Sequence, residues 1–344
     1  MHIYDDQDQL KRPFFVLAPM DDVTESVFRR VVHGLAPADL YFTEFVNVDG
    51  LQSPGRPKLI KKLKHAAQEG PLVAQLWGKN PENFHKTAAE LADADSELNR
   101  SVRLGGAESN FVGIDLNMGC PAKSEVNNGT CSALIKNRPL ALEIIKATQE
   151  GAQAVEGKHD GLPVSVKTRL GFNTVDLTWH ELLLQQNLSM LTVHGRTRKE
   201  MSKVPAHWDL IGEVRQLRDK IAPQTLLVGN GDVRDRKHGL ELAEQYGLDG
   251  IMIGRGVFAN PFCFAEDADQ RWQELTREQR LVMFKHHVEL FADTWQTGER
   301  APITLNKFCK IYISNFDGAK ELREELMEAR DPAELLRLLD KADT

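Results

Sequence analysis

The residues best suited to chemistry lie in the segment DLNMGCPAKSEVNNGTC, residues 115–131. Cys120 stands there on a glycine-proline turn, directly after an apolar run that is typical of a barrel strand. The loops after the strands of such a barrel build its active site, and a thiol in that place can give or take a proton. The alternative is a small buried apolar side chain, the usual fate of a free cysteine, and position alone leaves both readings open.

Two glycine-containing segments, GNGD at 229–232 and GRG at 254–256, each follow an apolar run. Glycines let backbone N–H groups approach an anion closely, and the loops after the last two strands of a barrel commonly hold a phosphate. Arg255 would add a charge-assisted contact to such a group. The alternative is that these glycines only turn the chain into the next helix.

Lys167 lies within the apolar segment PVSVKTRL, where a dry and unpaired ammonium would be costly. At the upper end of a strand it would meet a ligand, and near the carbonyl edge of an isoalloxazine it would stabilise negative charge on the reduced ring. Gln75 and Asn117 are candidates for the remaining edge groups of such a ring. Lys167 could also extend along the barrel rim to solvent, and Gln75 could simply bond the neighbouring backbone.

His194 opens the segment HGRTR, in which Arg196 and Arg198 follow. This histidine could bind phosphate, hydrogen-bond a base or relay a proton, and its alternative is a hydrogen-bonded structural imidazole. The two arginines lie on a loop over the predicted barrel mouth. They could hold nucleic-acid phosphates, although exposed arginines are usually only solvated.

Apolar runs with helix-like segments between them must position these residues. Several runs are rich in Val, Ile and Leu without alternation, as parallel strands covered by helices are. Eight strand-helix units over roughly 250 residues predict an α/β fold, a (β/α)₈ TIM barrel. An open doubly wound sheet is the main competitor, and it is weakened because no GxGxxG follows the first run. The runs are residues 14–18, 40–46, 72–77, 112–117, 163–168, 190–194, 225–229 and 249–254.

The character of the chain changes after about residue 261. Strand signals disappear from residue 271 on, and apolar residues recur at spacings of three and four in a heavily charged sequence. Breakers stand near 297–302 and at 317–318. We therefore predict a catalytic barrel over residues 1–265, followed by a small all-α helical-bundle domain over residues 266–344.

Composition restricts the class of protein. The 344 residues are 41% hydrophobic and 27% charged, as in globular proteins, and no apolar run approaches the ~20 residues that cross a bilayer. Four widely spaced cysteines without a CxxC pair argue against a disulfide framework or structural zinc, so we expect a cytoplasmic protein without a metal. The net charge of -7 argues against nucleic-acid binding through overall charge, but not through a local basic face.

In their order and spacing, the motifs of the barrel segment resemble the tRNA-dihydrouridine synthase family: APMDDVTESVFR, TEF, DLNMGCPAK, VKTRLG, HGRTR, GNGDV and IGRGVFANP. The later segment NKFCKIYISNFDGAKELREELM is similar to that family's carboxy-terminal helical domain. The combined match is specific, whereas any one piece, GRG above all, would be weak.

The resemblance implies an FMN enzyme that reduces a particular uridine of tRNA to 5,6-dihydrouridine, with NADPH reloading the flavin. In the family the flavin N5 delivers hydride to C6 of uracil and the loop cysteine protonates C5, which makes Cys120 the expected acid. A thiol acts as an acid only while protonated, so the pKa of Cys120 should not be strongly depressed. By the same matching the FMN site would be lined by Ala18, Pro19, Met20, Gln75, Lys167, His194, Asn230, Gly231, Asp232, Gly254 and Arg255.

The resemblance also implies contacts with tRNA, because a uridine must leave its stack to react and the enzyme has to hold the surrounding backbone. We expect a monomer whose helical domain binds tRNA, with no membrane partner. The expected substrate contacts are Asn117, Lys123, Arg169, Arg196, Arg198, Lys307 and Lys310. A second basic group, with a solvated helix face as its alternative, is formed by Arg56, Lys58, Lys61, Lys62 and Lys64.

The sequence departs from the family in two places. After HGRTR the family continues with a glutamine, a tyrosine and a glycine before a tryptophan, whereas Glu200, Ser202 and Val204 precede Trp208 here. Base recognition at that loop is therefore open. Cys131 replaces a small residue of the family, and we interpret it as a packing residue, with a redox partner of Cys120 as the alternative.

Two other functions are compatible with the residues. One is an FMN barrel that acts on a free small molecule, such as a dihydroorotate-type dehydrogenase, with the helical tail as an oligomerisation element. The other is a barrel that binds RNA without turnover.

Overall fold

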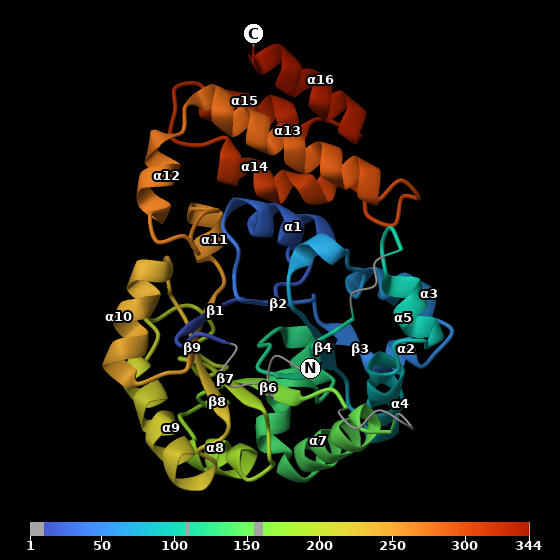
Figure 1. The fold of residues 1–344 in the computed structure, drawn as a ribbon, viewed down its shortest axis with the longest axis vertical. Coiled ribbons are helices and arrows are strands. Elements are labelled where there is room, and N and C mark those ends of the chain that lie inside the picture. The colour runs from blue at the N-terminus through green and yellow to red at the C-terminus, as the bar shows by residue number, and fades with distance from the viewer. Residues whose placement is uncertain (1–9, 107–109, 155–160, 344) are drawn as a thin grey trace.

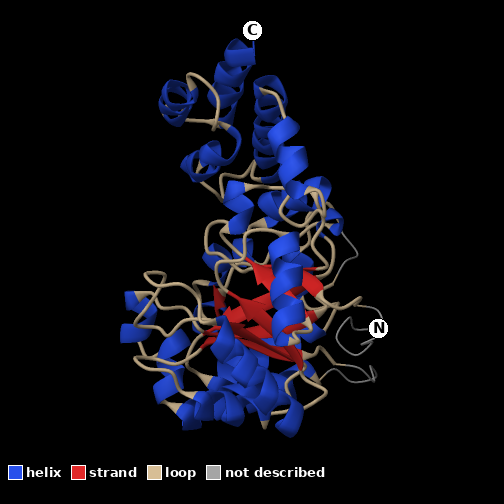
Figure 2. Cartoon of the chain, turned by 90° about the vertical axis from the view of Figure 1, so that its left-hand side faces the viewer, coloured by secondary structure: helices blue, strands red, loops and turns tan. Residues whose placement is uncertain are grey.

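The computed structural model describes residues 10–106, 110–154 and 161–343. Figure 1 shows a barrel of strands surrounded by helices in the lower part of the molecule and a layer of helices above it, and the side view in Figure 2 places the strands within the lower part. The upper helices come from the segment that begins with α12 (Ala268–Glu274). The molecule is therefore built in two consecutive parts.

Parallel strands form a closed barrel. The sheet order is β2-β1-β9-β8-β7-β6-β5-β4, and β2 also pairs with β4, which closes the ring. These strands coincide with the eight predicted runs, so the predicted TIM barrel is confirmed. Their bounds are β1 (Phe14–Leu17), β2 (Leu40–Phe42), β4 (Leu72–Trp77), β5 (Gly113–Met118), β6 (Val164–Arg169), β7 (Met190–His194), β8 (Leu226–Asn230) and β9 (Gly250–Ile253).

The second barrel strand is shorter than its run, residues 40–46, predicted. It stops at Phe42, and a separate strand, β3 (Val46–Asn47), pairs with β4 further along. Thr43 lies at the break, where its hydroxyl accepts a hydrogen bond from the N–H of Gln75 at 3.0 Å and donates to the carbonyl of Glu44 at 2.7 Å. A side-chain hydroxyl thus takes part in the hydrogen bonding at the point where the regular ladder stops.

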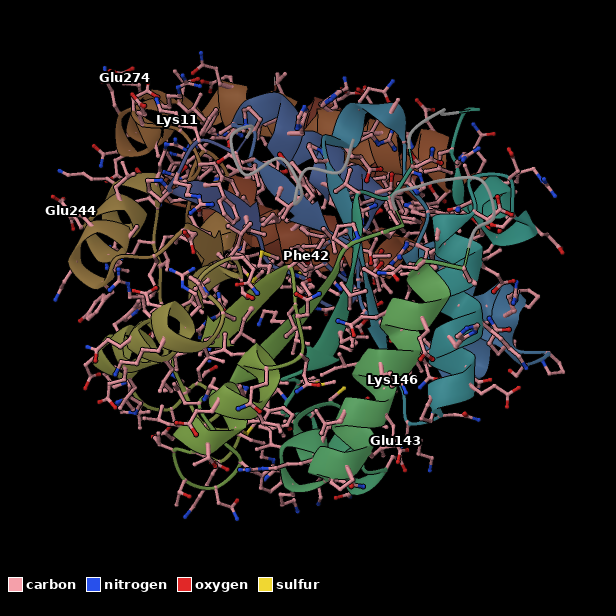
Figure 3. The ribbon with its side chains drawn as sticks, turned by 60° about the horizontal axis from the view of Figure 1, so that its bottom comes forward. Lys11, Phe42, Glu143, Lys146, Glu244 and Glu274 are labelled. Atoms are coloured by element: carbon pink, nitrogen blue, oxygen red, sulfur yellow. The ribbon has the colours of Figure 1, made fainter. Side chains whose placement is uncertain are left out.

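Both faces of the barrel sheet are buried. Phe14 and Phe42 belong to the core inside the barrel, whereas Phe15, the residue after Phe14, packs in the core against the outer helices. Figure 3 shows Phe42 among the strands, while Glu143 and Glu244 lie on helices at the outside. The absence of apolar-polar alternation in the runs follows from this double burial.

Helices cover the outside of the barrel, and several of them begin at a side-chain cap. At the start of α4, Asn80 accepts a hydrogen bond from the N–H of Glu82 at 3.0 Å, and Asp235 accepts one from His238 at 2.8 Å at the start of α10. The helices of this part are α1 (Ser26–Leu35), α2 (Val48–Leu51), α3 (Arg56–Leu59), α4 (Pro81–Ala92), α5 (Glu97–Val102), α6 (Lys123–Asn127), α7 (Arg138–Ala152), α8 (Leu177–Leu184), α9 (Trp208–Ile221), α10 (Arg236–Tyr246) and α11 (Gly256–Ala259). Three 3₁₀ turns accompany them, η1 (Ile60–Lys62), η2 (Ala67–Glu69) and η3 (Cys131–Lys136).

The chain beyond the barrel is helical, as predicted. After α12 come α13 (Arg277–Thr294), η4 (Pro302–Leu305), α14 (Asn306–Tyr312), α15 (Ala319–Met327) and α16 (Pro332–Asp343). An aromatic core joins them to the barrel part: Phe308 contacts Phe28 of α1 with ring centroids 4.8 Å apart, and Phe284 stacks on Tyr312 at 5.2 Å. The predicted boundary at residue 265 lies just before α12, and the division into two domains stays a prediction.

A buried ion pair fastens the helical region to the barrel. Arg300 and Glu44 form this pair, and their side chains are only 2% and 0% exposed. Beside it the indole N–H of Trp295 donates to Glu25 at 3.1 Å, and Lys64 pairs with Glu299 at 2.7 Å. The contact therefore lies at the end of the barrel where the chain leaves β1 and β2.

In the part of the chain that the structure describes, none of the helices combines the length and the apolar composition of a membrane span.

Candidate active site

A cavity of about 460 Å³ opens at the carboxyl ends of β1, β6, β7, β8 and β9. Ten of the eleven residues predicted to line an FMN site border it, and Gln75 is the exception. The carboxyl end of a parallel barrel is where active sites are built. The lining residues are Ala18, Pro19, Met20, Lys167, His194, Asn230, Gly231, Asp232, Val233, Arg234, Gly254, Arg255, Gly256 and Ala259.

One side of the cavity is made by the loops after β8 and β9. Gly231 has a φ of +130°, and a Cβ added there would come within 2.7 Å of the Cβ of Ala206, so glycine is required. Asp232 follows and pairs with Arg196 and, at 2.9 Å, with Arg255. Burial raises the pKa of Asp232, but the hydrogen bonds from Arg196 and a backbone N–H outweigh it and lower the pKa. Asp232 is thus a fixed anion that holds two cations at the rim.

Lys167 and His194 reach the same cavity from β6 and β7. Burial and the nearby charge of Arg169 lower the pKa of Lys167 to about 8, against the charge of Asp115, which raises it, and the side chain is half-buried. Burial and the charges of Arg169 and Lys167 hold the pKa of His194 well below its usual range, so the ring is neutral at pH 7. Its Nδ1 is buried and, within the described ranges, unpaired. The Nδ1 of His194 is therefore a buried polar atom on the cavity wall that a ligand would satisfy.

The loop that carries Cys120 is held tightly. The side-chain oxygen of Asn117 accepts hydrogen bonds from the N–H groups of Gly119 at 3.1 Å and Cys120 at 2.9 Å. From the other side, Arg169 donates from Nε to the carbonyl of Gly119 at 2.8 Å. Because a Cβ at Gly119 would lie 3.2 Å from the backbone of Thr168, the loop runs directly against β6. Cys120 itself is half-buried and free of any disulfide.

The pKa of Cys120 differs from the prediction. A hydrogen bond from Cys131 is the main cause that lowers it, to about 7, assisted by the N–H of Ala122 and by Arg169, while burial raises it. The same bond and burial raise the pKa of Cys131. Cys131 is fully buried, as expected of a packing residue, but it is also the neighbour that tunes Cys120. The pKa of Cys120 is therefore lowered, whereas we expected that it would not be strongly depressed.

Gln75 is bonded inside the barrel and does not line the cavity. Its Nε2 donates to Asp115 at 2.8 Å, and its Oε1 accepts from Asn117 at 3.1 Å. Sequence reasoning missed Asp115, which is fully buried, and burial raises its pKa to about 6 against hydrogen bonds from Ser165 and Gln75 that lower it. A charged residue within an apolar strand, the signal that singled out Lys167, was present here as well.

The predicted substrate contacts fall into two groups. Asn117 and Arg169 are buried and bonded to the Cys120 loop, so they position it. Arg196 is also buried, with a side chain 2% exposed that pairs with Asp232, and the prediction of a contact over the barrel mouth is wrong for it. Lys123 is exposed at the start of α6, three residues after Cys120.

Arg198, Lys307 and Lys310 lie further from the cavity. Arg198 is half-buried, and its guanidinium lies 5.2 Å from the ring centroid of Phe172. Lys307 and Lys310 are exposed on α14, and the ammonium of Lys307 donates to the carbonyl of Asp22, in the loop after β1. This bond places α14 beside the mouth of the barrel.

The second basic group is largely engaged within the chain. Arg56 pairs with Glu90 at 2.8 Å, Lys62 pairs with Asp21, and Lys64 pairs with Glu299. Lys61 donates to the carbonyl of residue 299 at 2.9 Å. Only Lys58 of this group is exposed, so the group serves mainly to fasten neighbouring elements.

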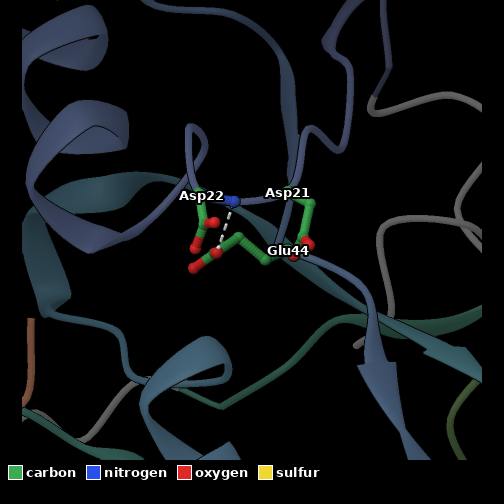
Figure 4. Close-up of side chains that lie close together, drawn as sticks. All are labelled: Asp21, Asp22 and Glu44. Atoms are coloured by element: carbon green, nitrogen blue, oxygen red, sulfur yellow. Dashed lines mark hydrogen bonds between the residues drawn. The ribbon is translucent and has the colours of Figure 1, made fainter. Parts of the chain in front are cut away.

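Three carboxylates approach one another after β1 and β2, as Figure 4 shows: Asp21, Asp22 and Glu44. Glu44 accepts a hydrogen bond from the N–H of Asp22 at 2.8 Å and pairs with Arg300, while Asp21 pairs with Lys62. These cations balance the carboxylates, and we assign no metal to the cluster.

The loop that departs from the family pattern is held by Glu200. Its carboxylate accepts from the N–H of Thr197 at 2.7 Å and lies 3.0 Å from Nε2 of His207. The carbonyl of Val204 accepts from Arg196. Glu200 and Val204 therefore organise the loop.

Known proteins resemble the chain over almost its whole length. A family model described as "Dihydrouridine synthase (Dus)" matches residues 16–344. The chain is 45% identical over 336 residues to "Probable tRNA-dihydrouridine synthase" of Staphylococcus aureus strain N315, with 97% of this chain and 94% of that protein covered. It is 44% identical over 336 residues to "Probable tRNA-dihydrouridine synthase 2" of Bacillus subtilis strain 168, with 96% and 94% covered.

Among solved structures, morphinone reductase in complex with tetrahydroNAD is 14% identical, covers 75% of this chain and 86% of its own, and has a TM-score of 0.44. That score is too low to bear on the assignment. The family match and the identity to the two relatives confirm the resemblance seen in the motifs: the chain belongs to the dihydrouridine synthase family of oxidoreductases.

Proposed function

We propose that this protein reduces a specific uridine of tRNA to 5,6-dihydrouridine, with FMN as its cofactor and NADPH as the reductant. The observation that carries the proposal is the cavity at the carboxyl end of the barrel, with Lys167, His194 and Arg255 on its wall and Cys120 on an adjacent loop. The names of the relatives support tRNA as the substrate, and the residues of the cavity support a bound flavin.

The donors of the cavity fit a flat, anionic cofactor such as FMN. The buried Nδ1 of His194, unpaired among the described residues, is a hydrogen-bonding group that a ligand would satisfy, and the half-buried Lys167 lies on the same cavity wall. Gly231 and Gly254 leave the backbone open where a phosphate would approach, and Arg255 lies beside them. Reduced FMN, when bound, supplies a hydride from N5 to C6 of uracil.

Cys120 supplies the proton. Hydride arrival at C6 leaves negative charge at C5 and its neighbouring carbonyl, and the thiol of Cys120 gives its proton to C5 and remains as a thiolate. Cys131 stabilises that thiolate, because it is the hydrogen-bond neighbour that lowers the pKa of Cys120. Solvent then returns a proton to the sulfur before the next turnover.

Lys123, Lys307 and Lys310 are the exposed cations that we assign to the tRNA backbone. Lys123 lies on the helix that follows the Cys120 loop, and Lys307 contacts the loop after β1. Cations on both the barrel and the helical region would hold an RNA that spans the two parts. We therefore propose that residues 266–344 form the tRNA-binding domain.

The test compares Cys120→Ala with the wild-type protein. We expect the variant to keep the absorbance of bound flavin and to lose nearly all dihydrouridine formation, because only the proton donor is removed. Wild-type turnover in the variant would exclude Cys120 as the acid. NADPH oxidation that depends on unmodified tRNA separates this function from a reductase of free small molecules, and a colourless protein would support RNA binding without turnover.

A further inference from the structure

A chain of buried hydrogen bonds leads from the barrel interior to Cys120. It begins at Asp115, whose two carboxylate oxygens accept from the hydroxyl of Ser165 at 2.6 Å and from Nε2 of Gln75 at 2.8 Å. Asp115, Ser165 and Gln75 are all fully buried. Burying a carboxylate costs free energy, and hydrogen bonds such as these two offset part of that cost.

The chain continues from Gln75 to the backbone of the loop. Asn117 donates from Nδ2 to Oε1 of Gln75 at 3.1 Å. With its oxygen, Asn117 accepts from the N–H groups of Gly119 and Cys120 at 3.1 and 2.9 Å. Asn117 is 8% exposed, so water does not readily replace these bonds.

The direction of every bond is fixed by the two ends. A backbone N–H can only donate, so the oxygen of Asn117 must face the loop and its NH₂ group must face Gln75. The oxygen of Gln75 must then face Asn117, and its NH₂ group must face Asp115. An ionised carboxylate can only accept. The backbone N–H groups thus set the orientation of both amides from one end, and the carboxylate of Asp115 is the acceptor that matches this orientation at the other end.

We infer that Asp115 is a positioning residue for Cys120, acting through Gln75 and Asn117. The inference rests on the proposed function, in which the thiol of Cys120 meets the substrate. The charge of Lys167 lowers the pKa of Asp115, but the hydrogen bonds of the carboxylate run to Ser165 and Gln75, and through Gln75 to the Cys120 loop. Asp115 touches neither substrate nor cofactor in this role.

Asp115→Asn tests the inference because, at almost constant side-chain volume, it replaces the carboxylate at the end of this series of hydrogen bonds with an amide. The new amide replaces a charged acceptor of Gln75 with a neutral one. If its oxygen stays toward Gln75, its NH₂ group has to donate to Ser165, whose hydroxyl must then turn to the carbonyl of Ile114; in the other orientation its NH₂ group faces the NH₂ group of Gln75. We expect kcat to fall about 10- to 100-fold, the usual effect of a small misplacement of a reacting group. The KM for tRNA should change less than about twofold, since the exposed cations are untouched.

A second variant, Asp115→Asn/Gln75→Glu, restores a carboxylate to the series of hydrogen bonds. The carboxylate now stands at position 75, where it accepts from the amides of residues 115 and 117 and leaves Asn117 in its original orientation. Ser165→Ala is the control, because it removes a bond to Asp115 that does not lead to Cys120 and should leave kcat within about threefold.

The direct readout is the rate of Cys120 alkylation by iodoacetamide as a function of pH, followed by mass spectrometry, which needs no flavin. The midpoint should move in Asp115→Asn and return in the double variant, while circular dichroism shows all variants folded. Equal profiles in Asp115→Asn and wild type would overturn the inference, as would a folded double variant that behaves like the single one. If the wild type lacks activity on tRNA but the alkylation profiles follow this pattern, the positioning role stands and the proposed function fails.

Discussion

Replacement of Cys131 by alanine should raise the pKa of Cys120. The hydrogen bond from Cys131 is the largest influence that holds this pKa at about 7, and burial opposes the smaller contributions of Ala122 and Arg169. Without Cys131 we expect the pKa to return toward the ordinary ~8.5 of a cysteine. Alanine is a mild replacement, because the residue is fully buried and its φ of +53° strains alanine and cysteine alike.

The size of the effect follows from titration. At pH 7 a thiol with a pKa of about 7 is half thiolate, whereas one at ~8.5 is roughly 3% thiolate, so alkylation should slow on the order of 10-fold. At pH 8 the protonated fraction instead rises from roughly 10% to roughly 75%. On the proposed function, proton donation needs the protonated thiol, so the alkaline limb of the single-turnover rate should move to higher pH in the variant.

The assay measures iodoacetamide alkylation of the native protein between pH 5.5 and 9.5. Cys263 and Cys309 do not interfere, because burial raises the pKa of both thiols. Cys131→Ser keeps a hydroxyl donor and should give a midpoint between those of the wild type and Cys131→Ala. The same midpoint in Cys131→Ala as in wild type would refute the assignment of Cys131 as the cause, and an unmoved alkaline limb would refute proton donation by this thiol.

Three further changes test other parts of the structure. Arg300→Met leaves Glu44 buried without its partner, and we expect it to lower the free energy of unfolding by about 3–5 kcal/mol in urea titrations, whereas a loss below about 1 kcal/mol would contradict a stabilising pair. Lys307→Ala/Lys310→Ala should weaken tRNA binding and reduce the slope of log K against log salt concentration by about 1 per lysine. The control Lys146→Ala, on the exposed face of α7, should change neither the affinity nor the slope. A slope equal to that of the wild type in the double variant would show that the two lysines do not contact the tRNA. Lys167→Met should keep the fold and lower the reduction potential of the bound flavin by at least ~30 mV, which is a tenfold weaker preference for the reduced form. The potential is measured by a dye-coupled titration, and an unchanged value would show that Lys167 does not lie beside the flavin ring.

The fold was largely predictable because burial on both faces of a parallel barrel leaves uninterrupted apolar runs. All eight runs are strands. The break after Phe42 was not predictable, since it depends on the hydroxyl of Thr43 bonding to Gln75, a residue on the next barrel strand. Alternation and composition do not report such a bond.

The site was predictable where position along a strand decides it and unpredictable where a distant partner does. Residues that end their strands, such as His194 and Asn230, line the cavity because the strand ends converge. Arg196 looked exposed, but its partner Asp232 lies 36 residues away in the sequence. Likewise Lys64 looked available for nucleic acid, whereas Glu299, 235 residues away, occupies it.

The dry pairing of Arg300 with Glu44 has a consequence for selection among uridines. The helical layer cannot rock on the barrel without pulling two opposite charges apart in a place that water does not reach. An RNA bound to α14 would then reach the mouth of the barrel at a constant distance from its contact with that helix. On the proposed function, that distance determines which nucleotide along the RNA arrives at Cys120.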